Sequence, residues 1–162
     1  MTIEETLQIA LNAHSGQKDL DGKPAVLHPV AVGLMGSNDA EIKAGFLHDV
    51  LEDSDLTIDD LRRKGVDEEV LAALDLLTHD KGTDYFEYVS RIANSGNCTA
   101  IHTKLNDLKH NFDRGRKSYK TAMEQNDTEK AERLARINEK HQKALNIFGY
   151  APQYGSLESL DF

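Results

Sequence analysis

The sequence has a single cysteine, only three prolines and no long apolar run. A lone thiol, that of Cys98, excludes an internal disulfide and is typical of a reducing compartment. No apolar run approaches the ~20 residues that a membrane-spanning helix needs. The first residues also lack the basic start and the apolar stretch of a signal peptide. We therefore expect a cytoplasmic protein with no membrane segment.

Basic residues are scarce, since 19 Lys and Arg stand against 28 Asp and Glu, for a net charge of −9. Proteins that bind nucleic acids meet the phosphate backbone with clustered Lys and Arg, so a general nucleic-acid partner is not expected. A small phosphorylated substrate is still compatible with this charge, because bound divalent cations reverse the local field of a pocket. The composition does not indicate an oligomeric state.

Apolar residues recur with helical spacing along nearly the whole chain. The one strand-like run, residues 25–32, contains Pro29, which cannot donate a hydrogen bond to a sheet. We predict an all-α fold, a single-domain bundle of about eight helices over residues 1–148, followed by a C-terminal tail at 149–162. The predicted helices span about 3–13, 29–35, 39–51, 57–65, 67–77, 84–96, 97–112 and 128–148.

Several polar residues are predicted to begin these helices. Thr2 with Glu5 forms a capping-box pattern, and Thr57 with Asp60 forms a weaker one. Pro29 suits the first position of its helix, because a proline lacks the N–H that would have no partner there. Further predicted caps are Asn38 or Asp39, Asp67, Asp84 and Asn97.

The adjacent pair His48-Asp49 lies near the C-terminal end of the third predicted helix. Imidazole and carboxylate together suit divalent ions such as Mn, Fe, Zn or Mg. Taken alone, the pair favours a solvated helix end over a metal site.

Two further residues extend this pattern. His28 comes 20 residues before His48, and Asp107 lies beside the apolar stripe of a later helix. A carboxylate near a core face needs a cation or hydrogen-bond donors. The structural alternatives are a packed or capping histidine at position 28 and a salt bridge from Asp107 to Lys104. Together the four residues predict a metal site formed by His28, His48, Asp49 and Asp107.

The order of the segments HPVAV (28–32), AGFLHDVLED (44–53) and KLNDLKHN (104–111) resembles the HD-domain superfamily. More narrowly, it is similar to the hydrolase domain of the RelA/SpoT proteins and to the small alarmone hydrolases of the Mesh1 type. Further matches are AHSGQ (13–17), GKP (22–24) and LTHDK (77–81). The resemblance covers about residues 5–120. It implies a manganese ion, or another divalent metal, at the four predicted ligands.

The resemblance also implies that Glu52 and Asp53 are a catalytic acid pair. The implied reaction is water attack on the 3′-pyrophosphate of ppGpp, which gives GDP and pyrophosphate. A metal lowers the pKa of water, and carboxylates orient that water and handle the proton on the leaving oxygen. We assign Asp53 the role of positioning the water, and Glu52 the role of handling the proton on the leaving oxygen. The alternative is a structural acidic helix end, although carboxylates are unfavourable at a helix C-terminus.

Binding of phosphate groups requires cations. Lys81 and Lys104 match basic positions of the family, and Asn111 matches a residue that holds the nucleotide. Lys18 and Arg114 are further candidates for substrate binding, with an exposed surface charge as the alternative for each. We also consider Lys109, Arg116 and Lys117, and we expect the run 114–117 directly after the helix that carries Asp107.

Two positions depart from the family pattern. Asp19 stands where the family has an arginine that packs against guanine, and Ala25 replaces a tyrosine. An Arg-to-Asp change is not conservative, although Lys18 is a partial substitute. The alternatives are therefore an HD phosphatase acting on another nucleotide, such as NADPH or a nucleoside monophosphate, and a non-catalytic nucleotide-binding regulator. Alarmone synthesis is not expected.

The remaining reactive side chains have simpler interpretations. Cys98 has no partner base that would make it a nucleophile. Packing is the expected role of Tyr85 and Tyr88. The histidines without ligand-like companions in the sequence are His14, His79, His102, His110 and His141.

Overall fold

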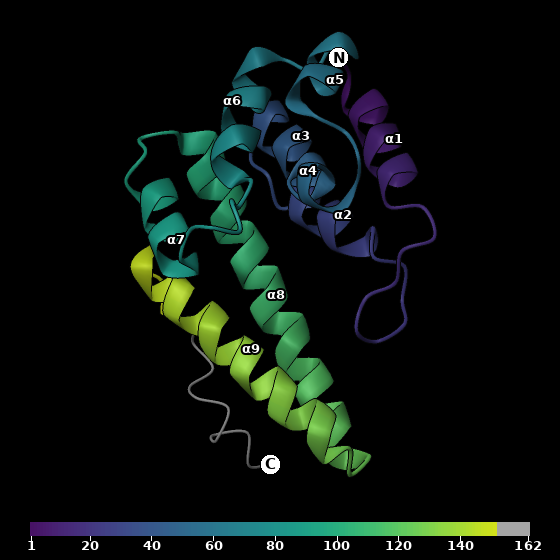
Figure 1. Ribbon diagram of the computed structural model, residues 1–162, viewed down its shortest axis with the longest axis vertical. Helices are drawn as coiled ribbons and strands as arrows, with labels where there is room; N and C mark the ends of the chain where they lie inside the picture. The colour runs from purple at the N-terminus through teal and green to yellow at the C-terminus, as the bar shows by residue number, and fades with distance from the viewer. Residues whose placement is uncertain (152–162) are drawn as a thin grey trace. The chain divides into compact units, whose positions relative to one another are not determined.

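The computed structural model describes residues 1–151, which form nine helical segments and no strand (Figure 1). This confirms the predicted all-α fold. Most of the predicted tail, residues 152–162, lies outside the described residues. The segments are α1 (Ile3–Ala13), α2 (Leu27–Leu34), α3 (Asp39–Leu47), α4 (Val50–Asp53), α5 (Ile58–Arg63), α6 (Glu68–Leu77), α7 (Tyr85–Ala93), α8 (Cys98–Glu124) and α9 (Thr128–Ile147).

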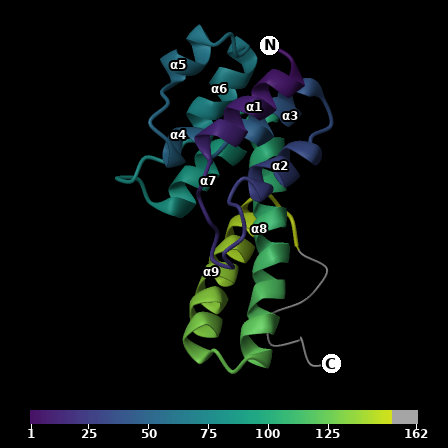
Figure 2. The ribbon, with the colours of Figure 1, turned by 90° about the vertical axis from the view of Figure 1, so that its right-hand side faces the viewer.

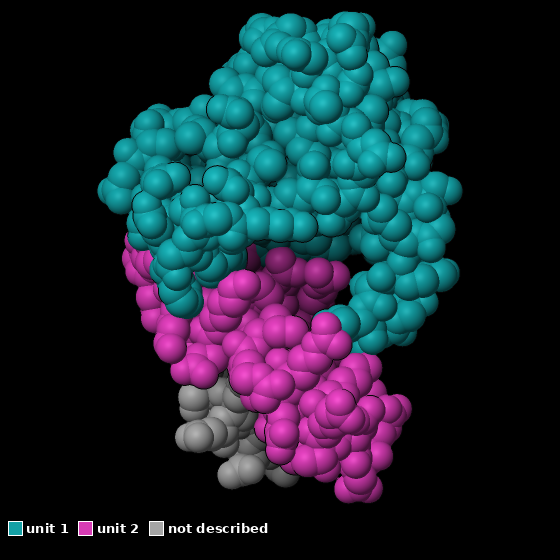
Figure 3. Space-filling model, in the orientation of Figure 1, with its two compact units in different colours: residues 1–107 teal, residues 108–162 magenta. Residues whose placement is uncertain are grey.

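The chain divides into two compact units, residues 1–107 and residues 108–162 (Figure 3). The boundary falls inside α8, so this helix contributes residues to both units. Among residues 1–151, no helix is both long and apolar enough to cross a membrane.

Most helices begin at the predicted caps. Thr2 and Thr57 form complete capping boxes, and Asn38 accepts a hydrogen bond from the amide of Glu41. Asp67 precedes α6 as predicted, but its side chain makes no cap bond and pairs with Lys43 at 2.7 Å instead. Further cap bonds come from Asp84, which accepts from the amides of Phe86 and Glu87, and from Asn97, which accepts from the amide of Ala100.

The prediction that one helix carries His48-Asp49 to position 51 is wrong. Helix α3 ends at Leu47, and α4 begins at Val50, so the pair forms the junction between two helices. The ring Nδ1 of His48 donates to the carbonyl oxygen of Gly45 at 2.7 Å. That carbonyl is the one that a continuing helix would pair with the amide of Asp49. The side chain therefore replaces the backbone donor where the helix breaks.

Two other expected boundaries also shift. Pro29 is the third residue of α2 rather than the first. The first turn tolerates it there, because those amides have no partner within the helix. The run 114–117 lies inside α8 and does not follow it. Gly115 is accommodated in this helix because its missing side chain makes room for Asn138, whose Oδ1 would lie 2.0 Å from an added Cβ.

In the first unit α3 packs against α1, α2 and α6 (Figure 1). Ala44, Phe46 and Leu47 are buried on this central helix. Helices α2 and α3 cross with their backbones in contact, because a Cβ on Gly45 would lie 2.6 Å from Cα of Gly33. The crossing keeps α2 beside α3, and His28 of α2 lies close to His48, the residue that directly follows α3.

In the second unit the later part of α8 and α9 form a helical hairpin (Figure 2). Its apolar contact consists of Ala122, Ala131 and Leu134, with Tyr119 packed beside them. Asn126 adopts a φ of 55° in the connecting turn. Asparagine tolerates this left-handed conformation better than most residues.

The close crossing of α2 and α3 gives a stability prediction. We expect Gly45→Ala to lower the free energy of unfolding by about 1–3 kcal/mol, because the new methyl group overlaps the backbone of Gly33. Gly82→Ala is the matched control, since its Cβ would meet its nearest neighbour, the Asp80 carboxylate, at 3.7 Å. Chemical denaturation measures both variants. Equal stability of the two would contradict the close crossing.

Candidate functional site

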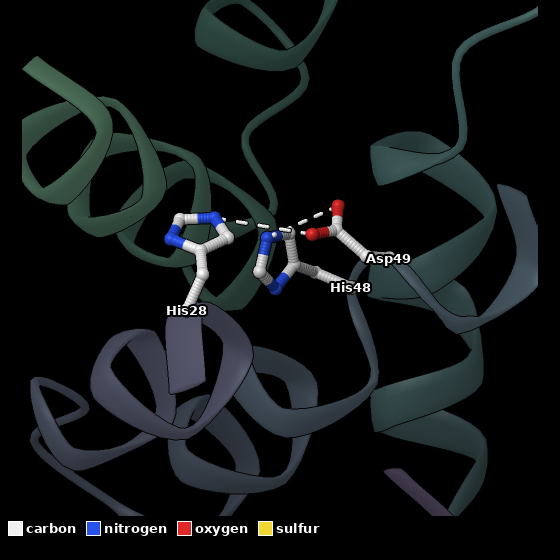
Figure 4. A group of neighbouring side chains, drawn as sticks. All are labelled: His28, His48 and Asp49. Atoms are coloured by element: carbon white, nitrogen blue, oxygen red, sulfur yellow. Dashed lines mark ion pairs between the residues drawn. The ribbon is translucent and has the colours of Figure 1, made fainter. Parts of the chain in front are cut away.

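Three predicted metal ligands meet in the first unit. One ligand atom each from His28, His48 and Asp49 lies within 4.8 Å of the others (Figure 4). The two imidazole rings lie edge to face with centroids 5.1 Å apart. Both histidines are 5% exposed, whereas the side chain of Asp49 is 33% exposed. The group is therefore open to solvent mainly on its carboxylate side.

Asp107, from α8, belongs to the same group. Its Oδ1 lies 3.0 Å from Nε2 of His28 and 3.6 Å from Nε2 of His48. The Asp49 carboxylate lies 3.2 Å from Nε2 of His48 and 3.9 Å from Nε2 of His28. All four residues named from the sequence thus come together from α2, the α3–α4 junction and α8.

The donor set fits a divalent cation. Two imidazole nitrogens and two carboxylates are ligands that such ions accept. Nε2 of His48 is buried and makes no hydrogen bond of regular geometry within the described part of the chain, although the carboxylates of Asp49 and Asp107 lie 3.2 and 3.6 Å from it. Because Nδ1 donates to Gly45, Nε2 is the ring atom left for a ligand role. Buried polar atoms normally have partners, so this atom is consistent with an ion.

Charge governs protonation in this group. Burial lowers the pKa of His28, and the nearby Asp107 does not fully offset that effect. Burial also acts to lower the pKa of His48, but the carboxylates of Asp49 and Asp107 outweigh it and raise that pKa to about 9. The first ring is thus mainly neutral and the second mainly protonated near pH 7.

Asp107 is shared between the histidines and a buried lysine. Its Oδ2 accepts from Nζ of Lys104 at 2.8 Å, and Lys104 is only 8% exposed. Burial alone would raise the pKa of Asp107, but the charge of Lys104 together with the histidines holds it well below its usual range. The ammonium also lies 5.1 Å from the ring centre of Tyr88 and 5.9 Å from that of Tyr85. The salt bridge considered as an alternative in the sequence is present.

The proposed acids, Glu52 and Asp53, are the last two residues of α4. One carboxylate oxygen of Glu52 accepts from the backbone N–H of His79 at 2.7 Å. Partial burial and the negative charge of Asp49 raise the pKa of Asp53. A carboxylate with a raised pKa is a better proton acceptor near neutral pH.

The candidate substrate residues fall into two groups. Lys18 and Lys81 are exposed on loops of the first unit. In the second unit Arg114 donates twice to Oδ1 of Asn111, at 2.9 and 2.6 Å. The other cations considered have partners in that unit, namely Phe112 for Arg116, Tyr150 for Lys109 and Asp113 for Lys117.

Asp19 has a structural role in its own loop. Its Oδ1 accepts from the backbone N–H groups of Asp21 and Lys23, both at 2.9 Å. Aspartate commonly stabilises turns in this way. The carboxylate of Asp19, which stands where the family has an arginine, is therefore hydrogen-bonded to the backbone of its own loop.

Three residues near the acids had no specific role among the predictions from the sequence. His79 donates to Glu52 and stacks on Tyr88 with ring centroids 4.5 Å apart. Gln17 donates to the carbonyl oxygen of Asp53, and His14 contacts Gln17. The available signal was that all three lie in the matched segments AHSGQ and LTHDK.

The buried ion pair gives a second stability prediction. We expect Lys104→Met to lower the free energy of unfolding by about 3–5 kcal/mol, because it leaves the Asp107 charge buried beside a neutral side chain. Lys117→Met is the control, since this exposed lysine pairs with Asp113 on the same helix and should change stability little. Denaturant titration compares the two variants, and a small loss for both would contradict the importance of the buried pair.

Comparison with known proteins gives partial sequence matches. No protein-family model matches the chain. A GTP pyrophosphokinase from Streptomyces antibioticus is 43% identical over 65 residues, which cover 38% of this chain and 8% of that protein. A guanosine-3′,5′-bis(diphosphate) 3′-pyrophosphohydrolase from Borreliella burgdorferi is 36% identical over 85 residues, covering 49% of this chain and 13% of that protein. The matches thus span a small part of the relatives' length.

One solved structure is similar over most of the chain. It is described as a metazoan ortholog of SpoT that hydrolyses ppGpp and plays a role in starvation responses. The two chains are 22% identical with a TM-score of 0.61, and the match covers 89% of this chain and 93% of the other. At this identity the likeness shows the fold. The chain therefore has the helical fold of a SpoT ortholog and shares sequence segments with RelA/SpoT-type enzymes, which confirms the resemblance noted in its motifs.

Proposed function

We propose that the chain is a metal-dependent phosphohydrolase that removes pyrophosphate from the 3′ position of ppGpp. The observation that carries this proposal is the four-residue donor cluster followed directly by the acids of α4. The Borreliella relative is a guanosine-3′,5′-bis(diphosphate) 3′-pyrophosphohydrolase and the similar structure is that of a protein that hydrolyses ppGpp, and both support the same substrate. The proposed partner is a small phosphorylated nucleotide, and the proposed location is the cytoplasm.

The proposed cofactor is Mn²⁺, held by His28, His48, Asp49 and Asp107. A divalent cation at this position supplies Lewis acidity, which favours deprotonation of water near neutral pH. Lys104 holds one oxygen of Asp107, so the other oxygen faces the histidines. The buried lysine therefore fixes the orientation of a ligand carboxylate.

The acids of α4 divide the proton transfers between them. Asp53 orients the water and accepts its proton, in keeping with the raised pKa of this carboxyl group. The water oxygen bonds to the phosphorus next to the 3′ oxygen, and the bond from that phosphorus to the ribose oxygen breaks. Glu52, which accepts a hydrogen bond from the backbone amide of His79, transfers the proton that the ribose oxygen gains. The products are GDP and pyrophosphate.

The proposed substrate-binding residues are Lys18, Lys81, Lys104, Asn111 and Arg114. Exposed lysines on the loops of the first unit supply positive charge for phosphate groups. Lys104 would reach a phosphate only by leaving Asp107, to which it is bound at 2.8 Å.

A second candidate substrate is a nucleotide with another base, such as NADPH or a nucleoside monophosphate. One observation favours it. The carboxylate of Asp19 is bound by its own loop, so position 19 offers no cation that could stack on guanine. A non-catalytic nucleotide-binding regulator is a third candidate, although such a protein has no need of paired acids beside the donor cluster.

The hydrolase proposal predicts product formation in vitro. We expect the Mn²⁺-loaded protein to convert ppGpp to GDP and pyrophosphate, measured by ion-exchange chromatography beside pppGpp, NADPH and a monophosphate panel. Glu52→Gln and Asp53→Asn should each lower kcat by about 10²- to 10⁴-fold. Asp55→Asn, an exposed acid two positions further on, is the control and should keep its rate. Lack of turnover of every 3′-phosphorylated nucleotide would exclude the proposal, and turnover of monophosphates alone would favour the second candidate.

The metal assignment predicts a proton-coupled binding step. Because the pKa of His48 is raised to about 9, its ring is protonated at pH 7, and Mn²⁺ must displace that proton. We expect release of about one proton per ion at pH 7, and an affinity that rises from pH 6 to pH 9. Calorimetry in buffers of different ionisation enthalpy measures this release.

Variants test the same assignment. Asp107→Asn and His48→Gln should lose most bound Mn²⁺, as measured by elemental analysis. His102→Gln should keep it, because that exposed ring pairs with Glu41 outside the donor cluster. Equal metal content in all three variants would show that the ion binds elsewhere. For the unmodified protein, Mn²⁺ at 100 times its Kd should raise stability by about 2.7 kcal/mol.

A further inference from the structure

The proposed catalytic acids lie on a helix of only four residues, Val50–Asp53. One helical turn is unstable by itself, because nucleation fixes several residues for a single hydrogen bond. The last carbonyl groups of a helix also lack partners within the helix. The orientation of this turn must therefore depend on contacts from outside α4.

Two such contacts come from opposite directions along the sequence. The side-chain Nε2 of Gln17, in the loop after α1, donates to the backbone carbonyl of Asp53 at 2.8 Å. The backbone N–H of His79, after α6, donates to the side chain of Glu52 at 2.7 Å. The contact from Gln17 involves only the backbone of Asp53 and leaves the carboxylate available for chemistry.

His14 determines how Gln17 is oriented. Nδ1 of His14 lies 2.9 Å from Oε1 of Gln17, and because this oxygen can only accept, the ring nitrogen is the donor. The amide oxygen is thus bound to the histidine, so the amide nitrogen faces Asp53. The same nitrogen lies 3.4 Å from the carbonyl of Ala13. Both ends of the amide are therefore fixed.

The histidine itself is held firmly. His14 is 3% exposed and caps α1, with its own amide bonded to the carbonyl of Ala10. Helix α1 packs against both α3 and α4. Nε2 of His14 is buried and makes no hydrogen bond within residues 1–151, so the bond to Gln17 is the one polar bond described for this ring.

We propose that His14 and Gln17 are positioning residues, which hold the acid-bearing turn α4 in place through the carbonyl oxygen of Asp53. This proposal rests on the proposed function, because it assigns the acids a catalytic role. Neither residue touches the reacting atoms. A displacement of about 1 Å at a catalytic group can cost up to about 100-fold in rate, so one hydrogen bond at the base of the turn matters.

The first test measures the turn directly and needs no substrate. Hydrogen exchange followed by mass spectrometry reports on the amides of residues 50–56. We expect Gln17→Met and Gln17→Glu to speed this exchange by about 3- to 10-fold, since each removes the donor to Asp53. Gln8→Met is the matched control, because Gln8 makes a side-chain bond of 2.9 Å to Asn12 on the exposed face of α1. Unchanged exchange in both Gln17 variants would overturn the proposal.

The second test measures the catalytic consequence. With ppGpp, we expect Gln17→Met to lower kcat by about 10- to 100-fold, with KM and Mn²⁺ content unchanged. His14→Leu should lower kcat in the unmodified chain and have little further effect in the Gln17→Met chain, because it acts through Gln17. Full additivity of the two changes, or loss of Mn²⁺ in Gln17→Met, would overturn the proposal. If the unmodified protein does not hydrolyse ppGpp, the proposed function fails, while the exchange experiment still decides whether the contact holds the turn.

Discussion

The buried carboxylate of Asp107 is the constraint around which the first unit is arranged. A negative charge away from water needs compensation, and here Lys104 takes one oxygen while His28 and His48 lie at the other. The lysine is in turn enclosed by Tyr88 and Tyr85, and Tyr88 stacks on the histidine whose amide binds Glu52. Neutralising one charge therefore links α2, α8 and the segment before α7 to the acid pair.

Much of this arrangement could be predicted from the sequence. Helical spacing and caps such as Thr2 and Asn38 depend on neighbours within four residues, so both can be predicted from the local sequence. Asp107 was predictable because a carboxylate is unusual beside an apolar stripe. His28 and His48-Asp49 were predictable from their ligand types, their spacing and their match to the family segments. The structure shows that His28, His48, Asp49 and Asp107 lie together, and their role as ligands stays a prediction.

Other features depend on contacts between distant segments, which local patterns do not contain. The helix break at His48 comes from a side chain that captures the Gly45 carbonyl, and apolar spacing alone continues through it. The crossing at Gly33 and Gly45 is a matter of backbone distance, and a glycine inside a helix does not reveal its partner. The hydrogen bond from Gln17 to the carbonyl of Asp53 likewise joins two segments that are distant in the sequence, so no local pattern predicts it.

The loop that carries Lys18 is largely self-supporting. Asp19 binds two amides of the loop, Lys18 and Pro24 form an isolated bridge, and the amide of Ala25 bonds to the carbonyl of Gln17. A segment already closed by its own bonds loses little conformational entropy when a ligand arrives. Asp19 thus serves the shape of the loop. Under the proposed substrate-binding role of Lys18, selectivity in this loop would come from that fixed shape and from the charge of its lysines.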